Sequence, residues 1–120
     1  MKIHKVLDVY NLSIDLITNL YNVTKSFPKE ELFGLTSQVR RSDVSIPSNI
    51  AEGSARNHSK EFKQFLNIAI GSASELDTLI LIAHKLGYIF QERYNNIILK
   101  LTSVSKMLQG FIKSIKSNSN

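Results

Sequence analysis

The chain has no cysteine and no tryptophan among its 120 residues. Without cysteine it can form no disulfide, perform no thiol chemistry and offer no thiolate to zinc or to an iron–sulfur cluster. Prolines number only two and glycines five. The remaining composition, with 42% hydrophobic and 21% charged residues, is that of a folded protein. At this length we expect a single domain over residues 1–120.

Long uninterrupted apolar runs are also missing. Polar residues interrupt the apolar ones throughout the N-terminal segment, which speaks against the hydrophobic region of a signal peptide. The most apolar stretch, 79–83, is far shorter than the ~20 residues that a membrane-spanning helix needs. We interpret it as a buried helix segment and expect a cytoplasmic protein with no membrane partner.

Motifs of known catalytic and metal sites are absent from the sequence. None of the six glutamates is followed three residues later by histidine, the pattern of di-iron sites in four-helix bundles. The three histidines lack metal-ligand spacing, and none follows an arginine at the four to six residues seen in helical RNA-cleaving bundles. P-loop, zinc-protease and serine-hydrolase motifs do not occur. The sequence predicts no enzyme, no metal site and no cofactor.

Helical periodicity is what the sequence does contain. Apolar residues recur every three or four positions over residues 6–25, 28–53, 59–86 and 91–116, with short breaks between these segments. No strand-like alternation or long linker occurs. The pattern predicts an all-α fold, an antiparallel up-down four-helix bundle. Pro47 lies inside the second segment and predicts a kink or a break there, and Gly53 is a plausible C-terminal stop.

The first helical segment is apolar over an unusually wide stripe. Its apolar residues occupy four of the seven heptad positions, more than one contact with a core requires. This width indicates a second buried contact, such as one with another subunit.

The net charge of +5 is confined to the last segment. Up to residue 92 the chain carries ten basic and ten acidic side chains, so the whole excess comes from the residues beyond. These five are Arg93, Lys100, Lys106, Lys113 and Lys116. A one-sided basic surface favours a polyanionic partner such as RNA or DNA. Lysines near a helix C-terminus also stabilise the helix dipole, which is the structural alternative.

A polar stripe follows the second segment at helical spacing. Its members are Gln38, Arg41, Ser45, Asn49, Glu52 and Arg56. Amide, hydroxyl and guanidinium groups make directional hydrogen bonds, which indicates recognition of a partner or of another subunit. The alternative is structural: Glu52 pairs with Arg56, Arg40 pairs with Asp43, and Asn49 caps a break near Pro47.

The same region resembles a known family. The strings Phe27–Glu31, Leu35–Arg41 and Val44–Gly53, followed by Phe65-Leu66, Gly71-Ser72 and Glu75-Leu76, look like the 23S rRNA intervening-sequence proteins, also called four helix bundle proteins. The resemblance extends over roughly residues 5–115. Carried onto this chain, the family motif comprises Gln38, Arg40, Arg41, Ser45, Pro47, Asn49, Glu52, Gly53 and Arg56.

The resemblance implies a small bacterial four-helix bundle that assembles into a ring-like homopentamer. Family members were first noticed as reading frames inside segments that interrupt bacterial 23S rRNA genes, and the family has no established biochemical role. A similar bundle, the accessory variability protein of diversity-generating retroelements, binds nucleic acid through a basic surface. We therefore expect an oligomeric, non-enzymatic module that binds nucleic acid weakly. The alternative is an assembly scaffold in which the polar stripe organises the oligomer or binds a protein partner.

Overall fold

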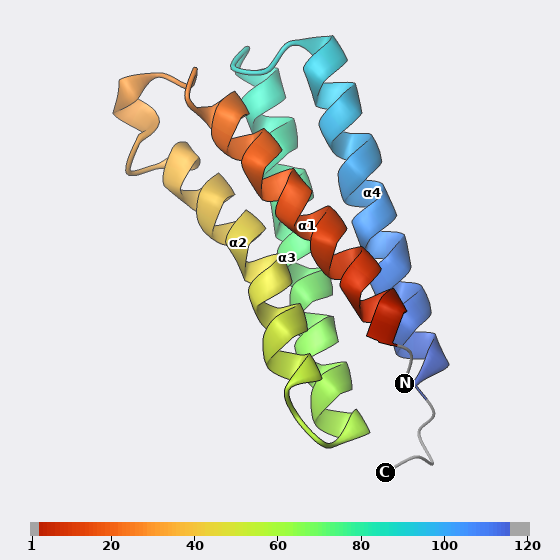
Figure 1. The fold of residues 1–120 in the computed structure, drawn as a ribbon. Helices are drawn as coiled ribbons and strands as arrows, with labels where there is room; N and C mark the ends of the chain where they lie inside the picture. Colours follow the sequence, from red (N-terminus) through yellow and green to blue (C-terminus); the bar gives the residue numbers. More distant parts are fainter. Residues whose placement is uncertain (1–2, 116–120) are drawn as a thin grey trace.

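The computed structural model describes residues 3–115, with side chains from residue 6 onward. Its four helices are α1 (Ile3–Thr24), α2 (Leu35–Ser54), α3 (Ser59–Lys85) and α4 (Gln91–Ser114), with a short 3-10 helix, η1 (Lys29–Glu31), between α1 and α2. The helices alternate in direction along a body of 48 × 25 × 19 Å (Figure 1). The described residues contain no strand. The prediction of an all-α four-helix bundle is confirmed.

Each helix packs on two neighbours, so that the four form a square in cross-section. The packed pairs are α1 with α2, α2 with α3, α3 with α4, and α4 with α1, and the α2–α3 contact is the most extensive. Over the described residues, the diagonal pairs do not pack directly on each other. As a result α4 lies diagonally opposite α2 (Figure 1).

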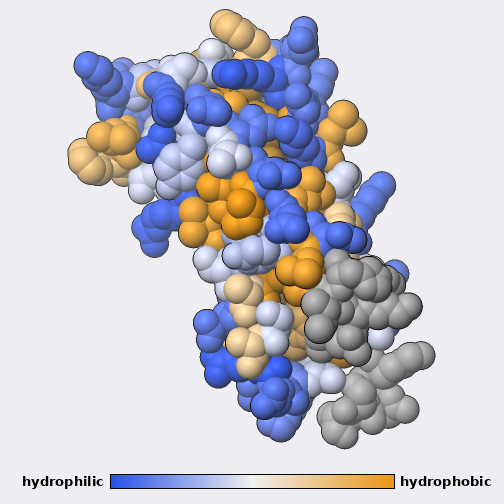
Figure 2. Space-filling model, in the orientation of Figure 1, coloured by the Kyte–Doolittle hydropathy of each residue, from blue (hydrophilic) through white to orange (hydrophobic). Residues whose placement is uncertain are grey.

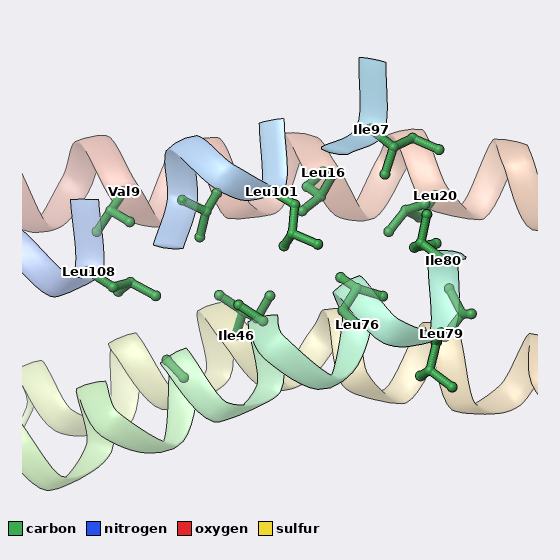
Figure 3. Close-up of a cluster of buried hydrophobic side chains, with 14 of the residues drawn as sticks. Val9, Leu16, Leu20, Ile46, Leu76, Leu79, Ile80, Ile97, Leu101 and Leu108 are labelled. Atoms are coloured by element: carbon green, nitrogen blue, oxygen red, sulfur yellow. The ribbon is translucent and has the colours of Figure 1, made fainter. Parts of the chain in front are cut away.

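Apolar side chains at spacings of three, four and seven fill the centre of the square (Figure 3). Leu16 and Leu20 of α1 face Ile97 and Leu101 of α4, while Leu76 and Ile80 of α3 lie opposite. All six side chains are at most 2% exposed. Burying each contributes roughly 1.5–3 kcal/mol relative to exposure, which makes this core the main source of stability.

The second helix differs from its predicted extent of 28–53. Residues 29–31 form η1, and α2 begins only at Leu35, after Gly34. Proline does favour the first turn of a helix, but here the turn that follows Pro28 is a separate 3-10 turn. At Pro47 the helix continues without interruption as far as Ser54, so the predicted break is wrong. A kink at Pro47 stays a prediction.

Helix α3 is long and apolar enough to span a membrane, judged by length and composition alone. In the bundle it packs between α2 and α4, and eight of its side chains are buried. The stretch 79–83 is only partly buried, contrary to the sequence interpretation. Leu81 and Ile82 are about two-fifths exposed because they lie on the outer side of the helix.

Candidate functional site

A polar groove runs between α2 and α3. It has a volume of about 360 Å³ and is lined by Gln38, Arg41, Ser42, Ser45, Ser72 and Glu75. Arg41, Ser42 and Ser45 lie three, four and seven positions after Gln38, so one face of α2 presents the four together. Ser72 and Glu75 are one turn apart on α3. The groove therefore combines a guanidinium, a carboxylate, an amide and three hydroxyls.

Serine hydroxyls form the floor of this groove. The Ser42 hydroxyl donates to the carbonyl oxygen of Ser72 at 3.1 Å, and the hydroxyls of Ser45 and Ser72 lie 2.8 Å apart in a hydrogen bond. Arg41, Gln38 and Glu75 form no hydrogen bond or ion pair with the described part of the chain. Their polar ends are therefore available to a ligand or a partner.

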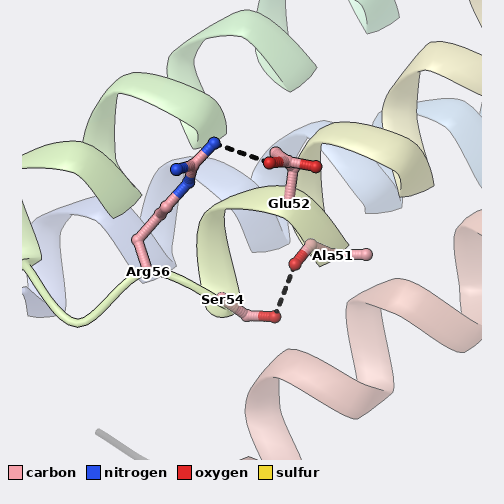
Figure 4. A network of polar contacts seen from close by, with 4 residues as sticks. All are labelled: Ala51, Glu52, Ser54 and Arg56. Carbon is pink, nitrogen blue, oxygen red and sulfur yellow. Dashed lines mark hydrogen bonds and ion pairs between the residues drawn. The ribbon is translucent and has the colours of Figure 1, made fainter.

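Only part of the predicted polar stripe lines the groove. Asn49 turns back within α2, where its amide donates to the carbonyl oxygen of Ser45 at 2.8 Å and to the Ser45 hydroxyl at 3.0 Å. Glu52 and Arg56 form an exposed ion pair of 2.6 Å at the end of α2, as expected from their spacing (Figure 4). Exposed pairs of this kind contribute less than about 1 kcal/mol to stability.

Two other motif residues have packing roles. Pro47 is buried, and Gly53 is buried where α2 crosses α3. A β-carbon at Gly53 would lie 2.7 Å from Cβ of Phe65 and 2.8 Å from Cδ1 of Phe62. Gly53 therefore permits a close approach of two helices, and its φ angle is not positive. It was predicted as a helix stop, but α2 continues one residue beyond it.

Arg40 does not pair with Asp43, contrary to the structural alternative considered above. Its guanidinium Nε donates to the Thr24 hydroxyl at 3.0 Å and its Cζ lies 4.4 Å from the centre of the Tyr21 ring, both on α1. Asp43 is fully buried, and neither of its carboxylate oxygens has a hydrogen-bond partner in the described chain. Removal from water raises the pKa of Asp43 to about 7.

The basic residues of α4 do not share one face. Seven-residue spacing places Arg93 with Lys100, and Lys106 with Lys113. The step of six positions from Lys100 to Lys106 turns the helix by roughly 600°, so the two pairs point in different directions. Lys106 and Lys113 are exposed and point away from the core, whereas Lys100 is half-buried. Lys116 lies outside the described residues. The expected single basic face thus becomes two basic pairs.

An apolar surface lies on the side of the bundle that α1 and α2 form. Leu7, Ile14 and Tyr21 of α1 are 50%, 37% and 39% exposed and recur every seven residues, and Val44 of α2 is 39% exposed. Figure 2 shows hydrophobic side chains gathered midway along the side formed by α1 and α2. We call these four residues the α1–α2 apolar face. It corresponds to the extra width of the apolar stripe in the first helical segment.

Histidines and acidic residues do not gather into a metal site. Among the described residues, no group of three or more potential ligands is close enough to hold a metal ion. His84 has a structural position, since its Nδ1 lies 2.8 Å from the carbonyl oxygen of Ile89 and its ring stacks on Tyr94.

Comparison with known families identifies the chain. The sequence model of the 23S rRNA-intervening sequence proteins matches residues 5–110, which include every groove residue and all of α2 and α3. The chain belongs to this family. Comparison with curated proteins found no match.

A solved structure shows the same fold. The crystal structure of a protein of unknown function from the S23 ribosomal protein family of Bacteroides thetaiotaomicron VPI-5482 is 29% identical to this intervening-sequence protein. The match covers 92% of this chain and 99% of that chain, with a TM-score of 0.85. The helical arrangement is therefore shared over nearly the whole length.

Sequence reasoning missed three groove residues of this family member. Ser42 lies between two of the strings that carry the family resemblance, and Ser72 and Glu75 entered only as parts of that resemblance. Ser72 and Glu75 have the i, i+3 spacing of helix neighbours, which was the available signal. Their place opposite Arg41 depends on how α2 and α3 are rotated against each other, which spacing within one helix does not specify.

Proposed function

We propose that this protein is a self-associating, non-enzymatic module that binds RNA or DNA weakly, mainly through the phosphate backbone. The main support for nucleic-acid binding is the placement of charge, since the whole excess of +5 comes from residue 93 onward. Most of that segment forms α4, which lies diagonally opposite α2. The α1–α2 apolar face contains no residue of α4, so assembly through it would leave the outer side of α4 open to a polyanion.

Self-association is supported by the exposed apolar side chains. Leu7, Ile14 and Tyr21 form one line along α1, and Val44 is exposed on the neighbouring α2. Covering these side chains with a second copy stabilises the assembly by ~25 cal/mol for each Å² of apolar area removed from water. The family resemblance adds the expectation of a homopentamer. In a ring the two basic pairs of each subunit are repeated, which multiplies the attraction for phosphate.

The assembly is tested by light scattering on a sizing column. The wild-type protein is expected to elute as an oligomer, and Ile14→Glu as a monomer, because a charge in the α1–α2 apolar face cannot be buried unpaired. The matched control is Leu99→Glu, since Leu99 is 70% exposed but lies on α4. A wild-type monomer, or an Ile14→Glu oligomer of unchanged mass, would show that this face is not the interface.

Nucleic-acid binding is tested by fluorescence anisotropy with a mixed-sequence RNA at about 50 and 200 mM salt, a range over which phosphate contacts weaken strongly. The double variant Lys106→Ala/Lys113→Ala should bind more weakly and lower the salt slope by about two, one for each lost contact. The charge-matched control Lys25→Ala/Lys29→Ala removes two exposed lysines from elsewhere. Absence of binding at the lower salt, or equal effects of both variants, would contradict the proposal.

A second candidate function is an assembly scaffold that depends on the polar groove. It is favoured by the three side chains there that have no partner in the described chain, Gln38, Arg41 and Glu75. In that case Arg41→Ala and Glu75→Ala should reduce the oligomer's mass, and lysine variants of α4 should have no functional effect. If Arg41→Ala leaves both mass and RNA affinity unchanged, the groove does not serve assembly.

A further inference from the structure

The turn between α3 and α4 has a fixed backbone. Gly87 adopts a positive φ of 83°, a conformation that glycine adopts without strain. The amide of Gly87 donates to the carbonyl oxygen of His84 at 3.0 Å, and that of Tyr88 to Ala83 at 2.9 Å. These two hydrogen bonds are the pattern that ends a helix with a left-handed residue. The direction of the chain after α3 is thereby set.

Side chains on both sides of Phe90 hold the turn in place. The Tyr88 hydroxyl donates to the Glu31 carboxylate at 3.0 Å, and its ring lies 5.4 Å from that of Phe27. Ile89 is 3% exposed and belongs to the core. The carbonyl oxygen of Ile89 lies 2.8 Å from Nδ1 of His84, and the His84 ring stacks on that of Tyr94 with 4.3 Å between ring centroids. The turn is anchored to Phe27 in the connection after α1, to η1, to α3 and to α4.

Phe90 projects from this rigid turn into solvent. Its backbone is extended, with φ −71° and ψ 156°, so that its side chain points away from that of the buried Ile89. The ring is 82% exposed. It borders a shallow pocket of about 330 Å³ that is also lined by Glu92, Arg93 and Asn96. Here an aromatic face, a guanidinium, a carboxylate and an amide lie together on a preorganised surface.

We propose that Phe90 is a stacking platform for an unpaired base of a single-stranded nucleic acid, with Arg93 contacting the adjoining phosphate. The proposal rests on the nucleic-acid binding proposed above and narrows its ligand to single strands. Every base has a π face, so stacking on an aromatic ring tolerates any sequence. Asn96 can donate to or accept from a base edge, and Glu92 can accept from an exocyclic amino group, although it repels phosphate.

A duplex cannot use this platform. Apart from the two end pairs, its bases are stacked on one another and present only their edges, so a ring such as that of Phe90 reaches them only after unstacking. The module should therefore bind single strands more tightly than duplexes of the same length. Without a stacking contact, attraction to phosphate alone would favour the duplex, which carries more charge per unit length.

The test measures anisotropy with a labelled single-stranded RNA and with the duplex of the same length at about 50 mM salt. Phe90→Ala should weaken single-strand binding roughly 5- to 100-fold, the effect of losing one stacked base, and leave duplex binding unchanged. Phe90→Trp should retain the single-strand preference. The matched control is Phe33→Ala, because Phe33 is 94% exposed but lines none of the polar pockets described above.

The outcomes separate this inference from the function on which it rests. If neither RNA binds at low salt, both the platform and the proposed function are wrong. If both RNAs bind and Phe90→Ala behaves like Phe33→Ala, nucleic-acid binding stands and the platform is wrong. If Phe90→Ala lowers the oligomer's mass on a sizing column along with the affinity for both RNAs, Phe90 is an interface residue, which also overturns the inference.

Discussion

Asp43 is the residue whose environment differs most from that of an ordinary surface carboxylate. It is fully buried, its oxygens lack partners in the described chain, and Arg40, which lies three residues earlier on the same helix, is engaged by α1 instead. Because burial disfavours the charged form, its pKa rises to about 7. Near neutral pH the carboxyl is thus poised between a neutral group and an uncompensated buried charge.

Stability is predicted to fall as pH rises between about 4 and 7. In this range the unfolded chain, with a pKa of 3.8 for this group, has lost its proton while the folded protein keeps it. Above pH 7 the free energy of unfolding is lower than below pH 4 by about 4 kcal/mol, the full contribution of this group. Urea unfolding of wild type and Asp43→Asn from pH 4 to 8 measures this. Asp43→Asn should be more stable than the wild type at pH 8, and its free energy of unfolding should change less with pH. Identical pH dependence in the two proteins would refute the prediction.

Gly53 sets the distance between α2 and α3. Gly53→Ala should destabilise the fold by about 1–3 kcal/mol, because the new methyl group would overlap Phe62 and Phe65. The control is Gly71→Ala, since Gly71 lies on α3 and a β-carbon there would meet nothing within 4 Å. That change should stabilise α3 by about 0.5–1 kcal/mol. Equal effects of the two substitutions in denaturant unfolding would count against a close approach at Gly53.

For single residues, the sequence indicates contacts along one helix better than contacts with a neighbouring helix. The i, i+4 pair Glu52–Arg56, part of the structural alternative, does form, although Arg56 lies two residues beyond the end of α2. The i, i+3 pair Arg40–Asp43, which the same alternative included, does not form, because a neighbouring helix offers Arg40 a hydroxyl and an aromatic ring. Spacing within a helix does not show what the next helix presents.

Among the elements, η1 and the start of α2 are linked through Glu31. One carboxylate oxygen accepts the backbone N–H of Leu35 at 3.2 Å, which satisfies an otherwise unpaired donor in the first turn of α2. The other accepts the Tyr88 hydroxyl. One side chain thereby fastens the α1–α2 connection to the α3–α4 turn. This hydrogen bond, with burial and the charges of Glu31 and Glu30, raises the pKa of Tyr88.

Glu31→Ala is predicted to destabilise the protein by about 1–2 kcal/mol, through loss of both hydrogen bonds. Tyr88→Phe removes only one of them and should cost less. Thermal unfolding of the two variants and of the double variant measures the contribution of each bond. A Glu31→Ala protein as stable as the wild type would mean that neither bond contributes.

The four helices were predictable because their core residues repeat with helical periodicity, as do Ile97, Leu101, Val104 and Leu108. The start of α2 was not, because Pro28 and the two glutamates after it are equally suited to a 3-10 turn and to the first turn of an α-helix. The polar groove was predictable only on its α2 side. Its α3 side follows from the way two helices are rotated against each other.

At the scale of the whole molecule, an oligomer ties stability to protein concentration. If the α1–α2 apolar face is covered by another copy, the midpoint of thermal unfolding should rise with concentration, by mass action on the assembled state. Ile14→Glu should unfold at a midpoint that does not depend on concentration. Scanning calorimetry over a tenfold concentration range distinguishes the two cases. A wild-type midpoint that is independent of concentration would exclude coupled assembly.

The square arrangement also makes the order of the chain nearly cyclic. Three of the four helix packings join helices that are consecutive in sequence, and the fourth joins the last helix to the first. The start of α1 and the end of α4 lie at the same end of the bundle (Figure 1). A short linker between these two ends would join α4 to α1 and make the chain circular, with every pair of packed helices directly connected. New termini opened at the exposed residues 55–58 should leave a native fold, whereas an opening at 88–90 would release Ile89 and should not.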